Sequence, residues 1–202
     1  MDGNHDLDNV SSSPVRLLLA STSPRRAELL RAAGFEFDAV RSDVDESPLP
    51  GEQPRDYVLR LALGKARAAS PAPGQIVIGA DTTVVVDGAM LGKPGSAEEA
   101  AAMVARLAGR THEVWTGVAL RLDGREVCDV GISRVEFAPL TAEEIAWYVA
   151  SGEPEGKAGA YAVQGLASRF VTRIDGSYSN VVGLPVALVY QLLGRLRDRR
   201  SG

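Results

Sequence analysis

The chain has 202 residues, of which 45% are hydrophobic and 24% charged, a composition typical of a soluble globular domain and too apolar for intrinsic disorder. Its formal net charge of −4 argues against a protein whose whole surface binds nucleic acid. Cys128 is the single cysteine, which excludes an internal disulfide, and no apolar run reaches the roughly 18 residues of a transmembrane helix. We therefore expect a cytoplasmic protein without nucleic-acid or membrane partners.

The polar, aperiodic residues 1–15 predict a flexible N-terminal tail, and we expect residues 16–202 to form a single domain. Apolar runs and helix-capping signals then define the predicted elements. The predicted strands cover residues 16–20, 35–40, 75–86, 89–91, 112–121, 125–137 and 169–174. The predicted helices cover residues 24–33, 55–69, 97–107, 142–149 and 186–196, with irregular loops at 153–166 and 177–185.

Helices and strands alternate along the chain, but two hairpin signals, Asp87-Gly88 and Asp123-Gly124, interrupt the alternation. No linker rich in proline or glycine divides the sequence. The pattern predicts an α/β fold in which helices flank a central mixed sheet.

Ser21-Thr22-Ser23-Pro24-Arg25-Arg26 lies where the first strand ends and a helix begins. Hydroxyl groups, helix N-terminal amides and two guanidinium groups are what a phosphate group requires. Two arginines are unfavourable at the positive end of a helix unless an anion neutralises them, so we favour a phosphate site. The alternative is an ordinary helix cap followed by solvated arginines.

Asp81 stands in the middle of the β-branched run IVIGADTTVVV. A buried carboxylate is costly unless it meets a cation, a metal or a hydrogen-bond network. Asp81 could therefore position a metal or act as general base towards water. An aspartate that caps a loop at the end of a strand is an equally good interpretation of the sequence alone.

Four further features are weaker signals. Lys93 follows the predicted hairpin and is, taken alone, best explained as a solvated turn lysine. The segment 156–165 combines three glycines with alanines and a tyrosine, which would let the backbone approach a ligand closely. His112 has no metal-ligand partner at suitable spacing and is expected to be structural, and the acidic cluster of Asp43, Asp45 and Glu46 is expected to be a solvated loop.

Together these segments closely resemble the Maf family of septum-formation-associated proteins, which are nucleoside-triphosphate pyrophosphatases. The stretches that carry the resemblance are LLLASTSPRRAELL, DVDES, GADTTVVVDGAMLGKP, THEVWTGVAL, GKAGAYAVQG and GSYSNVVGLP. The resemblance implies an elongated α/β fold of the Maf and ITPase type, with a cleft between two lobes. It also implies hydrolysis that depends on a divalent metal, Mg²⁺ or Mn²⁺, and a homodimer.

The resemblance also assigns roles by position. The proton acceptor of the family matches Asp81, which with Glu46 would serve the metal, and Lys93 completes the expected catalytic set. The remaining matches are the substrate-binding positions Ser21, Arg26 and Lys65 and the specificity positions Arg25, Thr82 and Gln164. The motifs resemble the branch that acts on dTTP and UTP more than the branch that acts on 7-methyl-GTP. The substrate could be a normal or a modified pyrimidine nucleotide.

One position departs from the family pattern. Gly156 stands where the family usually has an aspartate before Lys157, so the role of that acid is lost or taken by Glu155. Two alternatives stay open: a 7-methyl-GTP pyrophosphatase, and a nucleotide-binding regulator of cell division with little turnover. The acids Glu46 and Asp81 argue against the regulator, because binding of a polyanion alone gains little from carboxylates.

Overall fold

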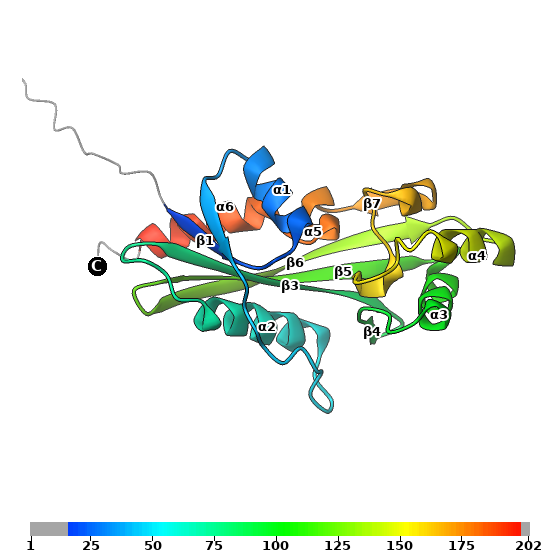
Figure 1. Ribbon diagram of the computed structural model, residues 1–202, viewed down its shortest axis with the longest axis horizontal. Helices are drawn as coiled ribbons and strands as arrows, with labels where there is room; N and C mark the ends of the chain where they lie inside the picture. The colour runs from blue at the N-terminus through cyan, green and yellow to red at the C-terminus, as the bar shows by residue number, and fades with distance from the viewer. Residues whose placement is uncertain (1–15, 199–202) are drawn as a thin grey trace, which may run out of the picture.

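The computed structural model describes residues 16–198, so the predicted tail lies outside the described residues. A mixed sheet forms the centre of the molecule (Figure 1). Its strands are β1 (Leu17–Ala20), β2 (Phe37–Val40), β3 (Ile76–Val86), β4 (Ala89–Leu91), β5 (Thr111–Leu122), β6 (Arg125–Phe137) and β7 (Val171–Asp175). The helices are α1 (Pro24–Ala32), α2 (Pro54–Ala68), α3 (Ala97–Leu107), α4 (Ala142–Ala150), α5 (Tyr178–Val182) and α6 (Val186–Asp198), with short 3₁₀ helices η1 (Ala158–Ala160) and η2 (Leu166–Arg169).

The strand order is β2-β1-β3-β5-β6-β7, and β4 pairs with β3. β1 is parallel to both of its neighbours, whereas the other pairs are antiparallel, which confirms the predicted mixed sheet. Both predicted hairpins form. Asp87 and Gly88, like Asp123 and Gly124, have positive φ angles, as a two-residue turn with the twist of a hairpin requires.

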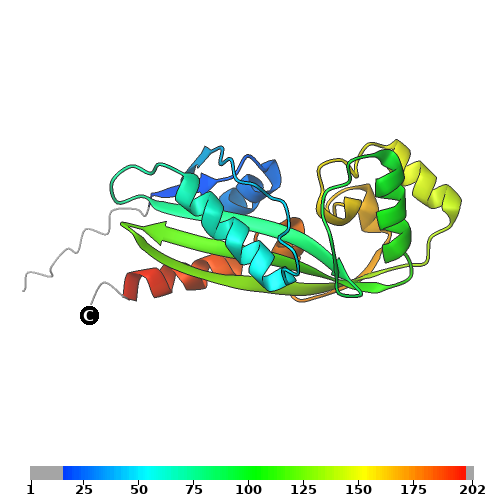
Figure 2. The same ribbon diagram turned by 90° about the horizontal axis from the view of Figure 1, so that it is seen from below.

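The sheet is elongated because β3, β5 and β6 are long and run through two lobes (Figures 1 and 2). In the first lobe, α2 covers one face of the sheet, and α1 and α6 cover the other. In the second lobe, α3, α4 and the segment that contains η1 and η2 pack around the far ends of the same strands. Each lobe therefore has its own apolar core on a shared sheet.

Two glycines allow α2 to lie directly on the sheet. A Cβ atom at Gly79 of β3 would overlap the main-chain oxygen of Ala62, and one at Gly117 of β5 would overlap that of Val58. Larger residues at either position would force the helix away. The close contact brings Lys65, near the C-terminal end of α2, against the middle of β3.

The structure corrects several of the sequence-based elements; β2, for example, begins at residue 37 rather than 35. Residues 177–185, predicted as a loop, contain α5, because the Ser177 side chain caps it and Asn180 donates hydrogen bonds to Val114 O and Ser133 Oγ. β7 begins two residues later than predicted, because η2 occupies the preceding residues. Among residues 16–198, no helix is both long and apolar enough to cross a membrane.

Candidate active site

The candidate site lies where one edge of β3 has no neighbouring strand. One edge of β3 pairs with β5 from residue 77 to residue 85. The other edge pairs with β1 at residues 76–78 and with β4 at residues 84–86. Within the described chain no strand pairs with residues 79–83 on that second edge, and a cavity of about 360 Å³ opens there.

The cavity brings together segments that are far apart in sequence. It is lined by residues 20–26 around the start of α1, by Asp81 and Thr82 of β3, and by residues of the glycine-rich segment that precedes η2. The predicted site residues that line it are Ser21, Arg25, Arg26, Glu46, Lys65, Asp81, Thr82, Lys93 and Gln164. All nine residues expected from the sequence therefore meet at one cleft between the two lobes.

Asp81 and Thr82 point to opposite faces of the sheet, as consecutive residues of a strand must. The carboxylate of Asp81 faces α2 and contacts Lys65. The hydroxyl of Thr82 faces α1 and α5, where it contacts Arg26 and Thr116. At the unpaired edge of β3, the Asp81 carboxylate therefore lies on one face of the sheet, and Arg26, held by Thr82, lies on the other.

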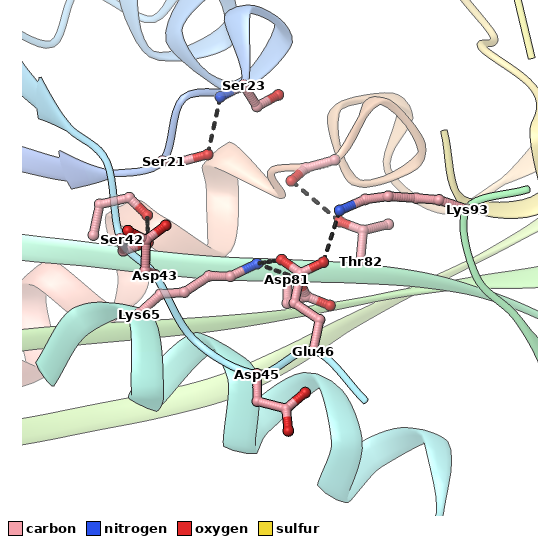
Figure 3. Close-up of polar contacts among 12 residues, drawn as sticks. Ser21, Ser23, Ser42, Asp43, Asp45, Glu46, Lys65, Asp81, Thr82 and Lys93 are labelled. Carbon is pink, nitrogen blue, oxygen red and sulfur yellow. Dashed lines mark hydrogen bonds and ion pairs between the residues drawn. The ribbon is translucent and has the colours of Figure 1, made fainter. Parts of the chain in front are cut away.

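A chain of ion pairs joins the two acids to two lysines (Figure 3). Lys65 Nζ lies 2.6 Å from Asp81 Oδ1 and 2.6 Å from Glu46 Oε1. Lys93 Nζ lies 2.7 Å from the other oxygen of Glu46. Partial burial by itself raises the pKa of Glu46. Hydrogen bonds and charge from both lysines outweigh that effect and lower the pKa to about 2. Glu46 is therefore ionised at neutral pH.

The loop that carries Glu46 is held by α2. Tyr57 O–H donates a hydrogen bond of 3.0 Å to Glu46 O, and Arg60 binds both Ser47 O and the carboxylate of Glu52. Burial and the negative charges of Asp81 and Glu46 raise the pKa of Tyr57 to about 12, so its hydroxyl remains a donor. Tyr57 lies within the predicted helix 55–69, and no sequence pattern there indicates this contact with the loop.

The other members of the predicted acidic cluster do not join the ion pairs. Asp43 pairs with Arg41, and the carboxylate of Asp45 accepts the Ser47 N–H and points away from the cluster (Figure 3). Both side chains are exposed, as expected for a solvated loop. Glu46 is the member of the cluster that departs from this expectation, because its carboxylate reaches Lys65.

Arg26 is fixed in a single orientation beside the acids. Its Nε donates to Gly183 O at 2.8 Å, and its two terminal nitrogens donate to Ser21 Oγ at 3.3 Å and Thr82 Oγ1 at 3.2 Å. Burial lowers the pKa of Arg26, and the charge of Asp81 opposes that effect. A guanidinium carries five N–H donors, so two remain for a ligand in the cavity.

Arg25 and Gln164 face the cavity from the two lobes. Burial lowers the pKa of the half-buried Arg25, while Glu28 raises it. Gln164 has an exposed side chain and lies between the buried residues Val163 and Ala167. The two side chains therefore lie at the rim of the cleft rather than on its floor.

At the position where the sequence departs from the family, Gly156 lines the cavity. Lys157 Nζ donates to the main-chain oxygen of Glu155, and the Glu155 side chain is exposed. Burial and the charge of Arg25 lower the pKa of Lys157. Lys157 thus lies between two residues that line the cavity, and its side-chain hydrogen bond goes to a main-chain oxygen rather than to an acid.

His112 lies outside this cleft in the core of the second lobe. Its Nε2 lies 2.8 Å from the Tyr161 hydroxyl, and its ring packs edge-on against Phe137 and Tyr161. Burial lowers the pKa of His112 to about 4, so it is neutral at pH 7. This environment agrees with the structural role predicted from the sequence.

The family model and the sequence relatives agree on one family of proteins. A family model described as Maf-like protein matches residues 16–196. A dTTP/UTP pyrophosphatase from Anaeromyxobacter dehalogenans is 53% identical over 89% of this chain and 93% of its own length. One from Geobacter metallireducens is 51% identical over 87% of this chain and 93% of its own length. A solved dITP/XTP pyrophosphatase from Mycobacterium abscessus has a TM-score of 0.40 and 22% identity, over 63% of this chain and 77% of that one.

Proposed function

The chain belongs to the Maf-like protein family, and from that premise we propose that it hydrolyses dTTP and UTP to the monophosphate and pyrophosphate. The observation that carries the proposal is the pair of carboxylates, Glu46 and Asp81, bridged by Lys65 at the floor of the cleft. Buried and half-buried charges are costly to desolvate, and a site for a neutral ligand would not need so many of them. The relatives named dTTP/UTP pyrophosphatase supply the substrate class.

Three cations surround the place of the triphosphate in this proposal. Lys65 and Lys93 approach from the α2 side and the β4 side, and Arg26 approaches from α1. Arg26 would bind phosphate oxygens through its free N–H groups, with Ser21 beside it. The first turn of α1 adds unfilled main-chain donors, because no side chain caps this helix. A polyanion can thus be neutralised locally in a protein of net negative charge.

Asp81 is the proposed general base. Its carboxylate accepts a proton from a water molecule while the water oxygen forms a bond to the α-phosphorus. The bond from that phosphorus to the bridging oxygen breaks, and pyrophosphate leaves with the electron pair. Lys93 and Arg26 neutralise the charge that develops on the phosphate oxygens. Positioning and charge neutralisation then supply most of the rate, as in other phosphoryl transfers.

A divalent cation, Mg²⁺ or Mn²⁺, fits these residues only in company with the substrate. Glu46 and Asp81 would hold it, yet the described residues contain no cluster of three or more His, Cys, Asp or Glu side chains suited to a metal. Mg²⁺ commonly uses one or two carboxylates and completes its shell with phosphate and water oxygens. The metal would supply further neutralisation of the triphosphate.

The base is proposed to be read by Gln164, with Thr82 and Arg25 shaping the pocket. Thymine and uracil present an O4 acceptor next to an N3–H donor, and an amide can match both with its own donor and acceptor. Cytosine presents the reverse pattern. A site that hydrogen-bonds one base edge rejects the reversed edge strongly, because polar groups are then left unpaired.

The expectations of a homodimer, a cytoplasmic location and the absence of nucleic-acid and membrane partners stay predictions. So does the choice between normal and modified nucleotides. Two competing functions remain to be tested against the proposal: hydrolysis of 7-methyl-GTP, and nucleotide binding in cell division with little turnover.

A nucleotide panel separates these functions. Purified protein is incubated with dTTP, UTP, CTP, GTP and 7-methyl-GTP, with Mg²⁺, with Mn²⁺ and with EDTA, and monophosphate and pyrophosphate are quantified. The proposal expects dTTP and UTP to be hydrolysed well above the others, with equal yields of monophosphate and pyrophosphate and no turnover in EDTA. Preference for 7-methyl-GTP, or binding without turnover, contradicts it.

A further inference from the structure

Residues 153–167, here called the cleft segment, bring Gln164 to the site from the second lobe. The segment has little regular structure, since it holds turns and the three-residue helix η1 before η2 begins. Side-chain and main-chain contacts must therefore fix its path. Glu153, at its start, makes an unusual set of them.

The carboxylate of Glu153 ties the two ends of the cleft segment together. Leu166 N–H donates to Glu153 Oε2 at 2.7 Å, and Ala167 N–H donates to Oε1 at 3.1 Å. The hydroxyl of Tyr148, a fully buried residue near the end of α4, also donates to Oε1 at 3.0 Å. Burial and the charge of Glu153 raise the pKa of Tyr148, which keeps that hydroxyl protonated.

Gly165 shows how closely the carboxylate fits. A Cβ atom at Gly165 would overlap Oε2 of Glu153, so a side chain there would displace the carboxylate from the N–H groups that it binds. Gln164 directly precedes this glycine. Glu153 therefore fixes the main chain from the peptide that follows Gly165, one residue beyond Gln164, while the Gly165 N–H donates to Ala162 O.

Separate contacts hold the first half of the cleft segment. Gly159 N–H donates to Gly92 O, next to Lys93, and Gly159 packs so closely on Val84 that a Cβ atom would clash. The Tyr161 hydroxyl meets His112 Nε2 in the core. None of these contacts involves Glu153, so loss of the Glu153 contacts leaves the phosphate end of the site supported.

We propose that Glu153 is a positioning residue for substrate selection: it fixes Gln164 in the orientation that distinguishes uracil and thymine from cytosine. This inference rests on the proposed function. According to this inference, the two halves of the cleft segment have different roles. The half anchored at Gly159 and Tyr161 supports the phosphate end, and the half anchored by Glu153 sets the choice of base.

Glu153→Gln is the sharpest substitution. A carboxylate accepts hydrogen bonds at both oxygens, whereas an amide has one oxygen and one NH₂ group. Whichever way the amide turns, its NH₂ faces either Leu166 N–H or the donors of Ala167 and Tyr148. One anchor is lost without any change in side-chain size.

Glu144→Gln is the matched control. Glu144 lies in the same lobe and its carboxylate also accepts a main-chain N–H, that of Thr141, in the cap of α4. Its hydrogen bonds to Thr141 lie within the cap of α4 and involve no residue of the cleft segment. A general loss of stability in this lobe should affect both variants, but a loss of base selection should affect Glu153→Gln alone.

The experiment measures kcat and KM for UTP and CTP in the wild type, Glu153→Gln, Glu144→Gln and Gly165→Ala. We expect Glu153→Gln to lower the UTP-to-CTP ratio of kcat/KM by about tenfold, as when one hydrogen-bonded selection contact is lost, while kcat for UTP stays within about twofold. Gly165→Ala should lower the ratio too, which covers the case in which Glu153→Gln does not fold. Glu144→Gln should leave it unchanged.

Two results overturn the inference in different ways. If the wild type is selective and Glu153→Gln keeps its ratio, or loses activity on both nucleotides equally, Glu153 has only a structural role. If the wild type hydrolyses no pyrimidine triphosphate, the proposed function fails and the inference fails with it.

Discussion

Lys65 and Asp81 form a buried ion pair across the junction of α2 and β3, with 2.6 Å between Nζ and Oδ1. Both side chains are less than a tenth exposed, and Glu46 is the second anion that Lys65 contacts. One ammonium thus holds the two acids of the cleft near each other. The pair is placed by packing, because Gly79 and Gly117 allow α2 to approach β3 and β5.

Removal of Lys65 should destabilise the fold. Lys65→Met leaves Asp81 buried without its cation, and breaking a buried pair on one side costs about 3–5 kcal/mol. Lys93→Met is the control, since Lys93 is exposed and exposed pairs contribute only about 0–1 kcal/mol. Denaturation in urea measures both. The double variant Lys65→Met/Asp81→Asn should recover part of the loss, and equal stability of the wild type and Lys65→Met would refute the assigned strength of this pair.

Lys93→Ala should reduce catalysis by roughly tenfold or more, because a charge-assisted phosphate contact contributes about 1.5–3 kcal/mol. The side chain of Lys93 is more than half exposed, so the fold should be retained. Steady-state kinetics with dTTP measure the effect. Wild-type kinetics in Lys93→Ala would place the phosphates elsewhere.

Gln164→Ala should narrow the UTP-to-CTP ratio of kcat/KM more than it lowers activity on UTP. The side chain borders the cleft and lies away from the ion pairs at its floor. Removal of an amide that reads the base therefore changes selection more than chemistry. The same two nucleotides are compared in the wild type and the variant, and an unchanged ratio means that Gln164 does not read the base.

His112 should make stability depend on pH. Burial lowers its pKa to about 4 in the folded protein, against an ordinary value of 6.5, so the unfolded chain binds more protons between these values. The contribution is complete above pH 6.5 and is lost as pH falls towards 4, by about 3 kcal/mol in total. Unfolding free energies of wild type and His112→Gln across this range test it: the variant should show the shallower slope, and parallel curves would contradict the assignment.

Much of the fold follows from local sequence. The long β-branched run of β3, the two Asp-Gly turns and the apolar periodicity of α3 each predict the element that forms. α5 was missed because it is a single short turn held by tertiary contacts of Asn180, which no local pattern reveals.

Some features of the site can likewise be predicted from local sequence, whereas others depend on tertiary packing. Paired arginines at a helix start and an acid inside an apolar strand stand out in the sequence as Arg26 and Asp81. The partnership of Lys65 with Asp81 is not visible there, because it depends on how closely α2 packs on the sheet. Tyr57 and Glu153 were missed for a related reason: each acts on main-chain groups, and such contacts leave no spacing signal.

Hydrolysis of UTP in water enriched in ¹⁸O tests the central claim most directly, namely that Asp81 directs water to the α-phosphorus at the cleft floor. Mass spectrometry of the products should find one ¹⁸O atom in the monophosphate and none in pyrophosphate. Asp81→Asn, shown to be folded by circular dichroism, should be slower by about 100-fold or more, the scale of a lost general base. Label in pyrophosphate, or a near-normal kcat in folded Asp81→Asn, would contradict the account.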